Sequence, residues 1–264
     1  MKILRQDFDL EFFFRRLRAS PVRVLMLDYD GTLAPFRVNP AEAAPYPGVV
    51  PLLDRIMEAG HTRLIIVSGR WTRSLMPLLG LRQQPEVWGS HGWERLQPNG
   101  EYDVVRIKQP ALDALVSADD WIDQIESLGG RCERKPGSLA FHWRGLDSGR
   151  VADIRQQIFQ NWQELGLGRD LVWHDFDGGI ELRAIGRDKG DVVRSIADEA
   201  GAAAVLGYLG DDVTDEHAFK AVPSGGVSIL VRPQFRTTAA DAWLRPPEEM
   251  LEFLTRWHET ASTA

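Results

Sequence analysis

Short apolar runs alternate with segments of helical spacing along most of the chain. Runs of about five apolar residues bounded by turn residues are typical of buried strands, and apolar residues three or four apart are typical of amphipathic helices. Because strands that alternate with helices usually form one parallel sheet, the pattern predicts an α/β fold with a Rossmann-like parallel-sheet core. The predicted core strands cover residues 22–27, 63–67, 86–88, 205–209 and 226–231. The helices predicted to accompany them cover residues 51–59, 71–79, 190–199, 214–220 and 247–257.

The rhythm changes between residues 109 and 185, where a helix followed by two short strands occurs twice. Apolar residues from Leu112 to Leu128, including Val116, predict one helix that ends at Gly129-Gly130. Apolar residues from Val151 to Leu165 predict the second helix. The strands are expected at residues 131–134, 138–143, 171–175 and 180–184, with a turn at 177–179 between the last two. We therefore expect an α+β cap domain at 109–185, inserted between core segments 1–108 and 186–264.

The first twenty residues predict a helix, because Leu10, Phe13, Phe14 and Leu17 lie at helical spacing. Charged residues flank its phenylalanines, so the segment is not the apolar centre of a signal peptide. We expect this helix to dock on the core; a helix lying on a membrane surface is the alternative. Apolar runs elsewhere are too short to span a bilayer, and no membrane partner is expected.

Composition narrows the range of partners. The chain has 264 residues, 44% hydrophobic and 26% charged, with a formal net charge of −7. This negative charge argues against nucleic acid as a partner, and an anionic substrate would need locally clustered cations. The single cysteine, Cys132, excludes an internal disulfide and suits a reducing cytoplasm, where we expect a monomer or weak oligomer.

Two carboxylates follow the first core strand, in the segment Asp28-Tyr29-Asp30-Gly31-Thr32. The carboxyl ends of strands are where open α/β sheets bind ligands. Gly31 predicts a bend that lets the two carboxylates converge, and such a pair is costly unless a cation joins it. The segment therefore indicates a metal-bound carboxylate pair, although an ordinary Asp-Gly turn is the alternative.

Further polar groups occur beside other predicted strand ends. Ser68-Gly69-Arg70 follows one strand and opens a helix, which suits an anion site or a plain N-cap. Lys189 precedes another helix. Acids cluster after the strand 205–209, where they would repel one another without a cation, unless they merely favour a helix N-terminus. These acids are Asp211, Asp212, Asp215 and Glu216. A hydroxyl, a lysine and acidic strand ends at one sheet edge together describe phosphoryl-transfer chemistry.

These motifs, taken in order, resemble those of the haloacid dehalogenase superfamily of phosphatases, and the insert resembles that superfamily's αββαββ cap. Within it, the chain is most similar to the trehalose-6-phosphate phosphatases. Trp93 and Trp143 depart from the pattern usual in that family. The motifs that carry the resemblance are Asp28-x-Asp30-Gly31-Thr32-Leu33-x-Pro35, Ser68-Gly69-Arg70, His91-Gly92-x-Glu94, Glu133-x-Lys135, His142-x-Arg144, Glu181, Lys189 and Gly210-Asp211-Asp212-x-Thr214-Asp215-Glu216-x-x-Phe219.

The resemblance implies roles for the residues of the core. Asp28 would attack phosphorus and form an aspartyl phosphate, and Asp30 would act as general acid and then as general base. Mg²⁺ would be bound by Asp28, the carbonyl of Asp30 and Asp211. The remaining implied roles are phosphate binding by Ser68, Gly69, Arg70 and Lys189, steering of Asp30 by Thr32, and support of the metal site by Asp212 and Asp215.

Cap residues would select the sugar. Glu133, Lys135, Arg144 and Glu181 are the candidates, with His142 as a weaker one. Their side chains could bind sugar hydroxyls. An exposed strand face of mixed charge would explain Glu133 and Lys135 equally well, and His142 could equally be a core histidine.

The sequence thus predicts a magnesium-dependent phosphatase acting on a sugar phosphate, with trehalose 6-phosphate as the leading substrate. A phosphatase for another glucosyl or amino-sugar phosphate is the enzymatic alternative. Outside the enzymes, a phosphoaspartate signalling module or a sugar-phosphate sensor could carry similar acids. Asp30 discriminates, because a module that keeps its phosphoryl group has no use for a neighbouring general base.

Overall fold

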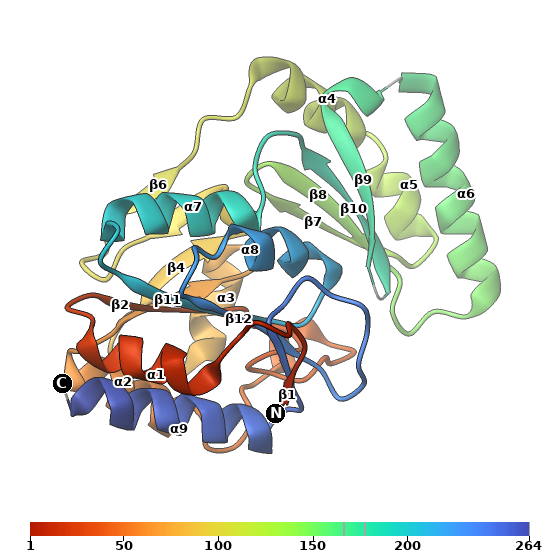
Figure 1. Ribbon diagram of the computed structural model, residues 1–264. Helices are drawn as coiled ribbons and strands as arrows, with labels where there is room; N and C mark the ends of the chain where they lie inside the picture. The colour runs from red at the N-terminus through yellow and green to blue at the C-terminus, as the bar shows by residue number, and fades with distance from the viewer. Residues whose placement is uncertain (166, 177, 264) are drawn as a thin grey trace. The chain divides into compact units, whose positions relative to one another are not determined.

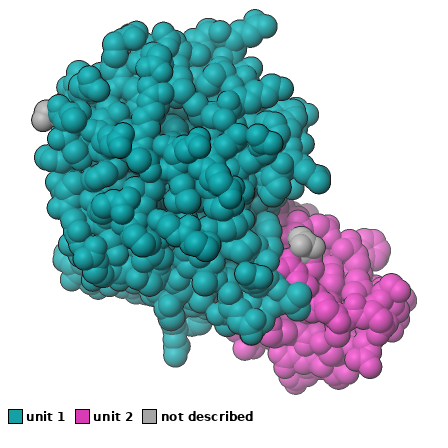
Figure 2. Space-filling model, turned by 90° about the horizontal axis from the view of Figure 1, so that it is seen from below, with its two compact units in different colours: residues 1–103, 188–264 teal, residues 104–187 magenta. Residues whose placement is uncertain are grey.

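A computed structural model describes residues 1–165, 167–176 and 178–263 of the chain. The chain forms two compact units (Figures 1 and 2). The core unit comprises Met1–Asp103 and Asp188–Ala264, and the cap unit comprises Val104–Arg187. Each unit has its own sheet.

The core sheet has nine strands and confirms the predicted α/β class. From β13 to β4 the strands are parallel, while β1 and β5 pair antiparallel at the two sides. In spatial order the strands are β1 (Lys2–Ile3), β13 (Ala242–Leu244), β12 (Val227–Val231), β11 (Val205–Gly210), β2 (Arg23–Leu27), β3 (Arg63–Val67), β4 (Glu86–Gly89), β5 (Glu94–Leu96) and β6 (Tyr102–Val104).

Helices cover both faces of this sheet (Figure 1). Strand β2 is buried on both sides: Leu25 and Leu27 enter one apolar cluster, and Val24 and Met26 enter the other. Such two-sided burial explains why the central strands are continuous apolar runs. The first cluster is formed with α1 (Leu10–Ala19), α2 (Val49–Ala59), α3 (Thr72–Leu79) and α9 (Glu248–Ser262); the second with α7 (Lys189–Ala200) and α8 (Glu216–Ala221).

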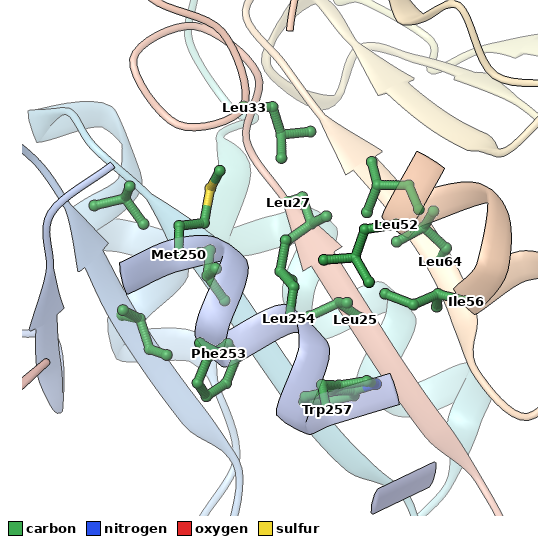
Figure 3. Packing of buried hydrophobic residues seen from close by; sticks show 14 of the residues in the cluster. Leu25, Leu27, Leu33, Leu52, Ile56, Leu64, Met250, Phe253, Leu254 and Trp257 are labelled. Carbon is green, nitrogen blue, oxygen red and sulfur yellow. The ribbon is translucent and has the colours of Figure 1, made fainter. Parts of the chain in front are cut away.

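The N-terminal helix α1 packs on the core, as expected. Its Phe13 ring lies 5.9 Å from that of Trp257, and its Phe14 ring lies 5.8 Å from that of Phe253. Figure 3 shows Phe253 and Trp257 of α9 in the same cluster as Leu25 and Leu27 of β2. The apolar face that could have met a membrane surface is therefore used in the core, where each buried aromatic contributes about 1.5–3 kcal/mol. Among the described residues, no helix is long and apolar enough to cross a bilayer.

The cap unit contains an antiparallel sheet in the order β7-β8-β10-β9. Residues alternate between two faces of this sheet, and helices pack on the apolar face. The strands are β7 (Arg131–Lys135), β8 (Ser138–His142), β9 (Leu171–Phe176) and β10 (Gly179–Ala184), and the helices are α4 (Gln109–Asp119), α5 (Ile122–Ser127) and α6 (Ser148–Leu165). The predicted turn at 177–179 includes residue 177, which lies outside the described residues.

The first cap helix differs from the prediction. The chain forms two helices, α4 and α5, rather than one, and Trp121 at the break stacks on Phe141 of the sheet at 6.1 Å. Two of the apolar residues that predicted the single helix, Leu112 and Val116, are 36% and 66% exposed. Instead α4 buries small side chains, which let its backbone approach the sheet closely. These are Ala111, Ala114 and Ala118.

Candidate active site

The candidate active site lies where neighbouring strands of the core sheet end. Asp28 follows β2, Ser68 follows β3 and Asp211 follows β11, and β2 pairs with both of the other strands. Because the three strands are parallel, their carboxyl ends share one edge of the sheet. Lys189 reaches this edge from the first residue of α7. The order of the strands thus assembles residues that are far apart in the sequence.

Lys189 links two buried aspartates. Its Nζ lies 2.7 Å from Oδ1 of Asp28 and 2.7 Å from Oδ1 of Asp215. Burial raises the pKa of Asp28 to about 7, although Lys189 opposes this. Burial also disfavours the charge on Lys189, but Asp215 and Asp28 outweigh it and raise the pKa of the ammonium group. The Lys189 ammonium group therefore stays positively charged, directly beside the Asp28 carboxyl group, whose negative charge burial disfavours.

Asp215 organises the acidic turn after β11. Its Oδ1 accepts hydrogen bonds from Lys189 Nζ at 2.7 Å and the Tyr208 hydroxyl at 2.6 Å. Its Oδ2 accepts from the backbone amides of Asp211 at 3.1 Å and Asp212 at 3.0 Å. A carboxylate offers about four lone-pair sites, so these donors saturate it. Asp215 is thus held by the protein and in turn fixes both Lys189 and Asp211.

Three carboxylates could hold a metal ion. Oxygen atoms of Asp28, Asp211 and Asp215 lie within 4.8 Å of one another, and all three residues are buried. Burial, with repulsion from Asp28, raises the pKa of Asp211 well above its usual value, so a cation would relieve the cluster. Since protein donors already satisfy Asp215, Asp28 and Asp211 are the carboxylates best placed to bind Mg²⁺, which prefers oxygen ligands.

Gly31 permits the close approach of Asp211. Its φ of +82° is a conformation that side chains disfavour, and a Cβ there would lie 2.2 Å from Oδ2 of Asp211. The bend predicted after the two aspartates is therefore present and has a steric reason. Asp212 stands apart from the three carboxylates, because it caps the short helix 213–215 through the amide of Asp215.

Two residues make contacts other than the expected ones. The hydroxyl of Thr32, which was expected to steer Asp30, donates to Oδ2 of Asp28 at 3.1 Å. Arg70, expected at the phosphate, forms a two-point ion pair with Asp30, with both N–O distances at 2.6 Å. A guanidinium fork matches the two oxygens of a carboxylate, which explains this preference.

The loop of Ser68 is closely packed. The Ser68 side chain is buried, and its Oγ accepts a hydrogen bond from the amide of Arg70 at 3.1 Å. Ser68 is not the N-cap of α3, which is Trp71, so the N-cap alternative is wrong. Gly69 contacts the ring of His91 so closely that a Cβ would lie 2.4 Å from its Cε1.

The motif His91-Gly92-x-Glu94 contributed to the family resemblance, but no function was predicted for it. In the structure Ser90 and His91 have positive φ values of 49° and 57°. The amide of Ser90 donates to the carbonyl of Arg70 at 2.7 Å, and that of His91 donates to the carbonyl of Ser68 at 3.0 Å. This left-handed turn therefore supports the Ser68 loop. Tyr208 was missed altogether; a tyrosine in a buried strand just before the acidic turn was the available signal.

The candidate sugar-binding residues of the cap unit gather on the polar face of its sheet. Glu133 and Glu181 lie on either side of Ala140, across β7, β8 and β10. Lys135 Nζ lies 2.5 Å from Oε1 of Glu181, and Arg183 Nε lies 2.6 Å from its Oε2. Glu181 is only 2% exposed. The side chain of Lys135 is 7% exposed, so the alternative of an exposed strand face is wrong for Lys135.

The other cap candidates lie beside this cluster. Nε2 of His142 lies 3.4 Å from Oε2 of Glu133, so His142 belongs to the polar face rather than the apolar core. Burial opposes the charge on Glu133, yet His142 and Lys135 together lower the pKa of its carboxyl. Arg144 lies against the turn before β10, where a Cβ on Gly178 would come 2.9 Å from its side chain.

The sequence matches the family model of trehalose-phosphatases over residues 26–242. The chain belongs to the trehalose-phosphatase family. It is 34% identical over 259 residues to a trehalose-phosphate phosphatase of Mycobacterium marinum. The aligned region covers 92% of this chain and 63% of that relative. The chain therefore spans less than two thirds of the length of that relative.

Solved structures agree with this family in fold. The C-terminal domain of a Candida albicans trehalose-6-phosphate phosphatase superposes with a TM-score of 0.77 at 21% identity, covering 98% of this chain and 99% of that one. A haloalkanoate-superfamily phosphatase of Bacteroides thetaiotaomicron gives 0.60 at 13% identity, covering 89% and 95%. The predicted resemblance to the trehalose-phosphatases is confirmed, and the chain shares its fold with the superfamily structure.

Proposed function

We propose that this protein hydrolyses trehalose 6-phosphate to trehalose and phosphate through an aspartyl phosphate on Asp28. The observation that carries the proposal is the buried arrangement of Asp28, Lys189 and Asp211 at the sheet edge of a trehalose-phosphatase-family chain. Lys189 supplies positive charge beside the nucleophile, which an anionic phosphate ester requires.

In the first half of the reaction, a carboxylate oxygen of Asp28 forms a bond to phosphorus. The bond between phosphorus and the sugar oxygen breaks, and Asp30 gives a proton to that oxygen. Ser68 and Lys189 bind the phosphoryl oxygens and stabilise the charge that develops on them. Thr32 holds the other oxygen of Asp28 and so orients the attacking one.

In the second half, a water oxygen attacks phosphorus while Asp30 accepts the water proton. The bond from phosphorus to Asp28 breaks, and its electron pair returns to the Asp28 carboxylate. We assign Mg²⁺ to the carboxylates of Asp28 and Asp211 and the carbonyl of Asp30, where it would offset the negative charge shared by enzyme and substrate. Asp212 and Asp215 support this site from the turn they stabilise.

In the cap unit we assign sugar binding to Glu133, Lys135 and Glu181, with Arg144 and His142 beside them. A face that combines carboxylates, a lysine and an imidazole can donate to and accept from sugar hydroxyls. The paired charges also keep these side chains fixed before a ligand arrives, which lowers the entropic cost of binding. A signalling module or a sensor is less well supported, because neither would use the general base Asp30.

The direct test measures phosphate release from a panel of esters: trehalose 6-phosphate, glucose 6-phosphate, an amino-sugar phosphate and p-nitrophenyl phosphate. Each is assayed with Mg²⁺ and with excess chelator. We expect trehalose 6-phosphate to have the highest kcat/KM and chelator to abolish turnover. A higher kcat/KM for glucose 6-phosphate would contradict the trehalose assignment but not the phosphatase, and full activity in chelator would contradict the metal assignment.

A further inference from the structure

The closest ion pair at the candidate site joins Arg70 to Asp30. Nε and NH2 of Arg70 each lie 2.6 Å from a different oxygen of the Asp30 carboxylate. A single hydrogen bond leaves a carboxylate free to rotate, whereas two parallel bonds fix its plane as well as its position. The two side chains are 14% and 26% exposed, so solvent screens the pair only partly.

Arg70 is itself anchored by the loop that follows Asp30. Its NH1 donates to the carbonyl of Pro40 at 2.9 Å, and its guanidinium lies over the ring of Tyr29 at 5.6 Å. The Tyr29 hydroxyl donates to the carbonyl of Ala43 at 2.6 Å, and burial raises the pKa of this phenol, so it stays neutral. The guanidinium therefore has a defined place, and Asp30 is held against a rigid partner.

The backbone of Arg70 is fixed from both sides. Its amide donates to Oγ of Ser68 at 3.1 Å, and its carbonyl accepts from the amide of Ser90 at 2.7 Å. Ser90 in turn donates through its hydroxyl to Glu94 at 2.7 Å, and Glu94 is fully buried. The left-handed turn at Ser90 and the phosphate loop thus place one arginine with little freedom to move.

We propose that Arg70 is the positioning residue for Asp30 during hydrolysis of the aspartyl phosphate. This inference rests on the proposed function. In that step Asp30 must be a carboxylate aimed at the attacking water, and a carboxylate is the form that a guanidinium binds at two points. Arg70 sets the direction of the acceptor oxygen; the proton passes from water to Asp30, and the bond from phosphorus to Asp28 breaks.

The test compares Arg70→Met and Arg70→Lys with the wild-type protein on trehalose 6-phosphate. Misplacing a catalytic group by about 1 Å costs roughly a hundredfold in rate, so Arg70→Met should lower kcat by about that factor. KM should fall with kcat, because slow hydrolysis of the aspartyl phosphate leaves kcat/KM nearly unchanged. Acid-quenched samples should contain more phosphoenzyme than the wild type, since hydrolysis slows more than formation. Lysine should recover part of kcat, because it keeps the charge but loses the two-point geometry.

If Arg70 instead binds phosphate, Arg70→Met should change substrate binding rather than the hydrolysis of the phosphoenzyme. KM for the ester and the inhibition constant for inorganic phosphate would then rise, without accumulation of phosphoenzyme. That outcome would overturn the proposal. A wild-type protein that turns over none of the esters would instead overturn the proposed function, and this inference with it.

A double-mutant cycle shows whether Arg70 acts through Asp30. If it does, Asp30→Asn and the double variant Asp30→Asn/Arg70→Met should have equal kcat; additive losses would contradict the proposal. Arg82→Met is the matched control, because Arg82 donates to Asp54 at 3.1 Å in an ion pair outside the site. The kcat and KM of Arg82→Met should equal those of the wild type. Thermal unfolding of Arg70→Met and Arg82→Met shows whether a variant has lost only a contact or has lost its fold.

Discussion

Both units bury a lysine against a carboxylate, but they fix the carboxylate differently. In the core unit, Asp215 accepts hydrogen bonds from the backbone amides of Asp211 and Asp212 as well as from Lys189. In the cap unit, Glu181 receives Lys135 and Arg183, side chains that come from the strand faces. A cluster anchored by the backbone is rigid wherever its turn forms, whereas one made of side chains depends on the register of several strands. The comparison separates the cluster proposed for catalysis from the cluster proposed for sugar binding.

The largest effect is expected from Asp28→Asn. An amide cannot form the aspartyl phosphate, and removal of a nucleophile typically costs about 10⁴-fold or more in kcat. The fold should persist, because Lys189 keeps its bond to Asp215. Steady-state turnover measures the loss of kcat, and circular dichroism checks that the fold persists. Turnover near the wild-type rate would show that Asp28 is not the nucleophile.

Asp30→Asn should reduce kcat by about 10² to 10⁴-fold, the usual contribution of general acid–base catalysis. Because Asp28 remains able to attack, phosphoenzyme should persist after a single turnover. Rapid-quench measurements of its decay test this, with the wild type as reference. A loss of less than about tenfold would move the proton-transfer role to another residue.

Asp215→Asn probes the backbone-anchored cluster of the core unit. An amide carries no charge and offers one acceptor oxygen where the carboxylate offers two, so Lys189 loses a carboxylate partner and keeps Asp28. Breaking a buried ion pair costs about 3–5 kcal/mol of unfolding free energy. Tyr208→Phe is the matched control, since it removes a single hydrogen bond worth about 1 kcal/mol. Denaturant unfolding measures both, and equal effects would contradict the central place given to Asp215.

The smallest effects are expected in the cap unit and depend on the substrate. Alanine at Glu133, Lys135 or Glu181 should lower kcat/KM for trehalose 6-phosphate by roughly ten- to a hundredfold, the cost of about 1.5–3 kcal/mol for one charged hydrogen bond. Hydrolysis of p-nitrophenyl phosphate, which has no distal sugar, should change little. Parallel losses on both esters would show that these residues support the structure of the unit instead of binding sugar.

The sequence was sufficient for the five central strands of the core sheet, from β12 to β4, and for the acids at the edge of the sheet. Asp28 and Asp211 follow apolar runs that alternate with helices, a pattern typical of a parallel sheet. The sequence could not supply pairings that depend on side-chain direction, such as Arg70 with Asp30 or Thr32 with Asp28. Hydrophobicity alone also did not identify the buried face of α4. The helix packs on the sheet through small alanine side chains, while Leu112 and Val116 are exposed. The two-residue strand β1 carries no pattern of its own and is defined only by its partner β13.

The left-handed turn at Ser90 and His91 has a consequence for the evolution of the chain. A residue other than glycine in such a conformation costs of order 1 kcal/mol or more, so glycine at either position would relieve the backbone. A history of selection for thermal robustness alone would favour that exchange. The turn instead carries the side chains of Ser90 and His91. The Ser90 hydroxyl donates a hydrogen bond to Glu94 and so links it to the loop beside Ser68. Glycine at position 90 would lose the hydroxyl that donates to Glu94, so the strained turn and this hydrogen bond come together.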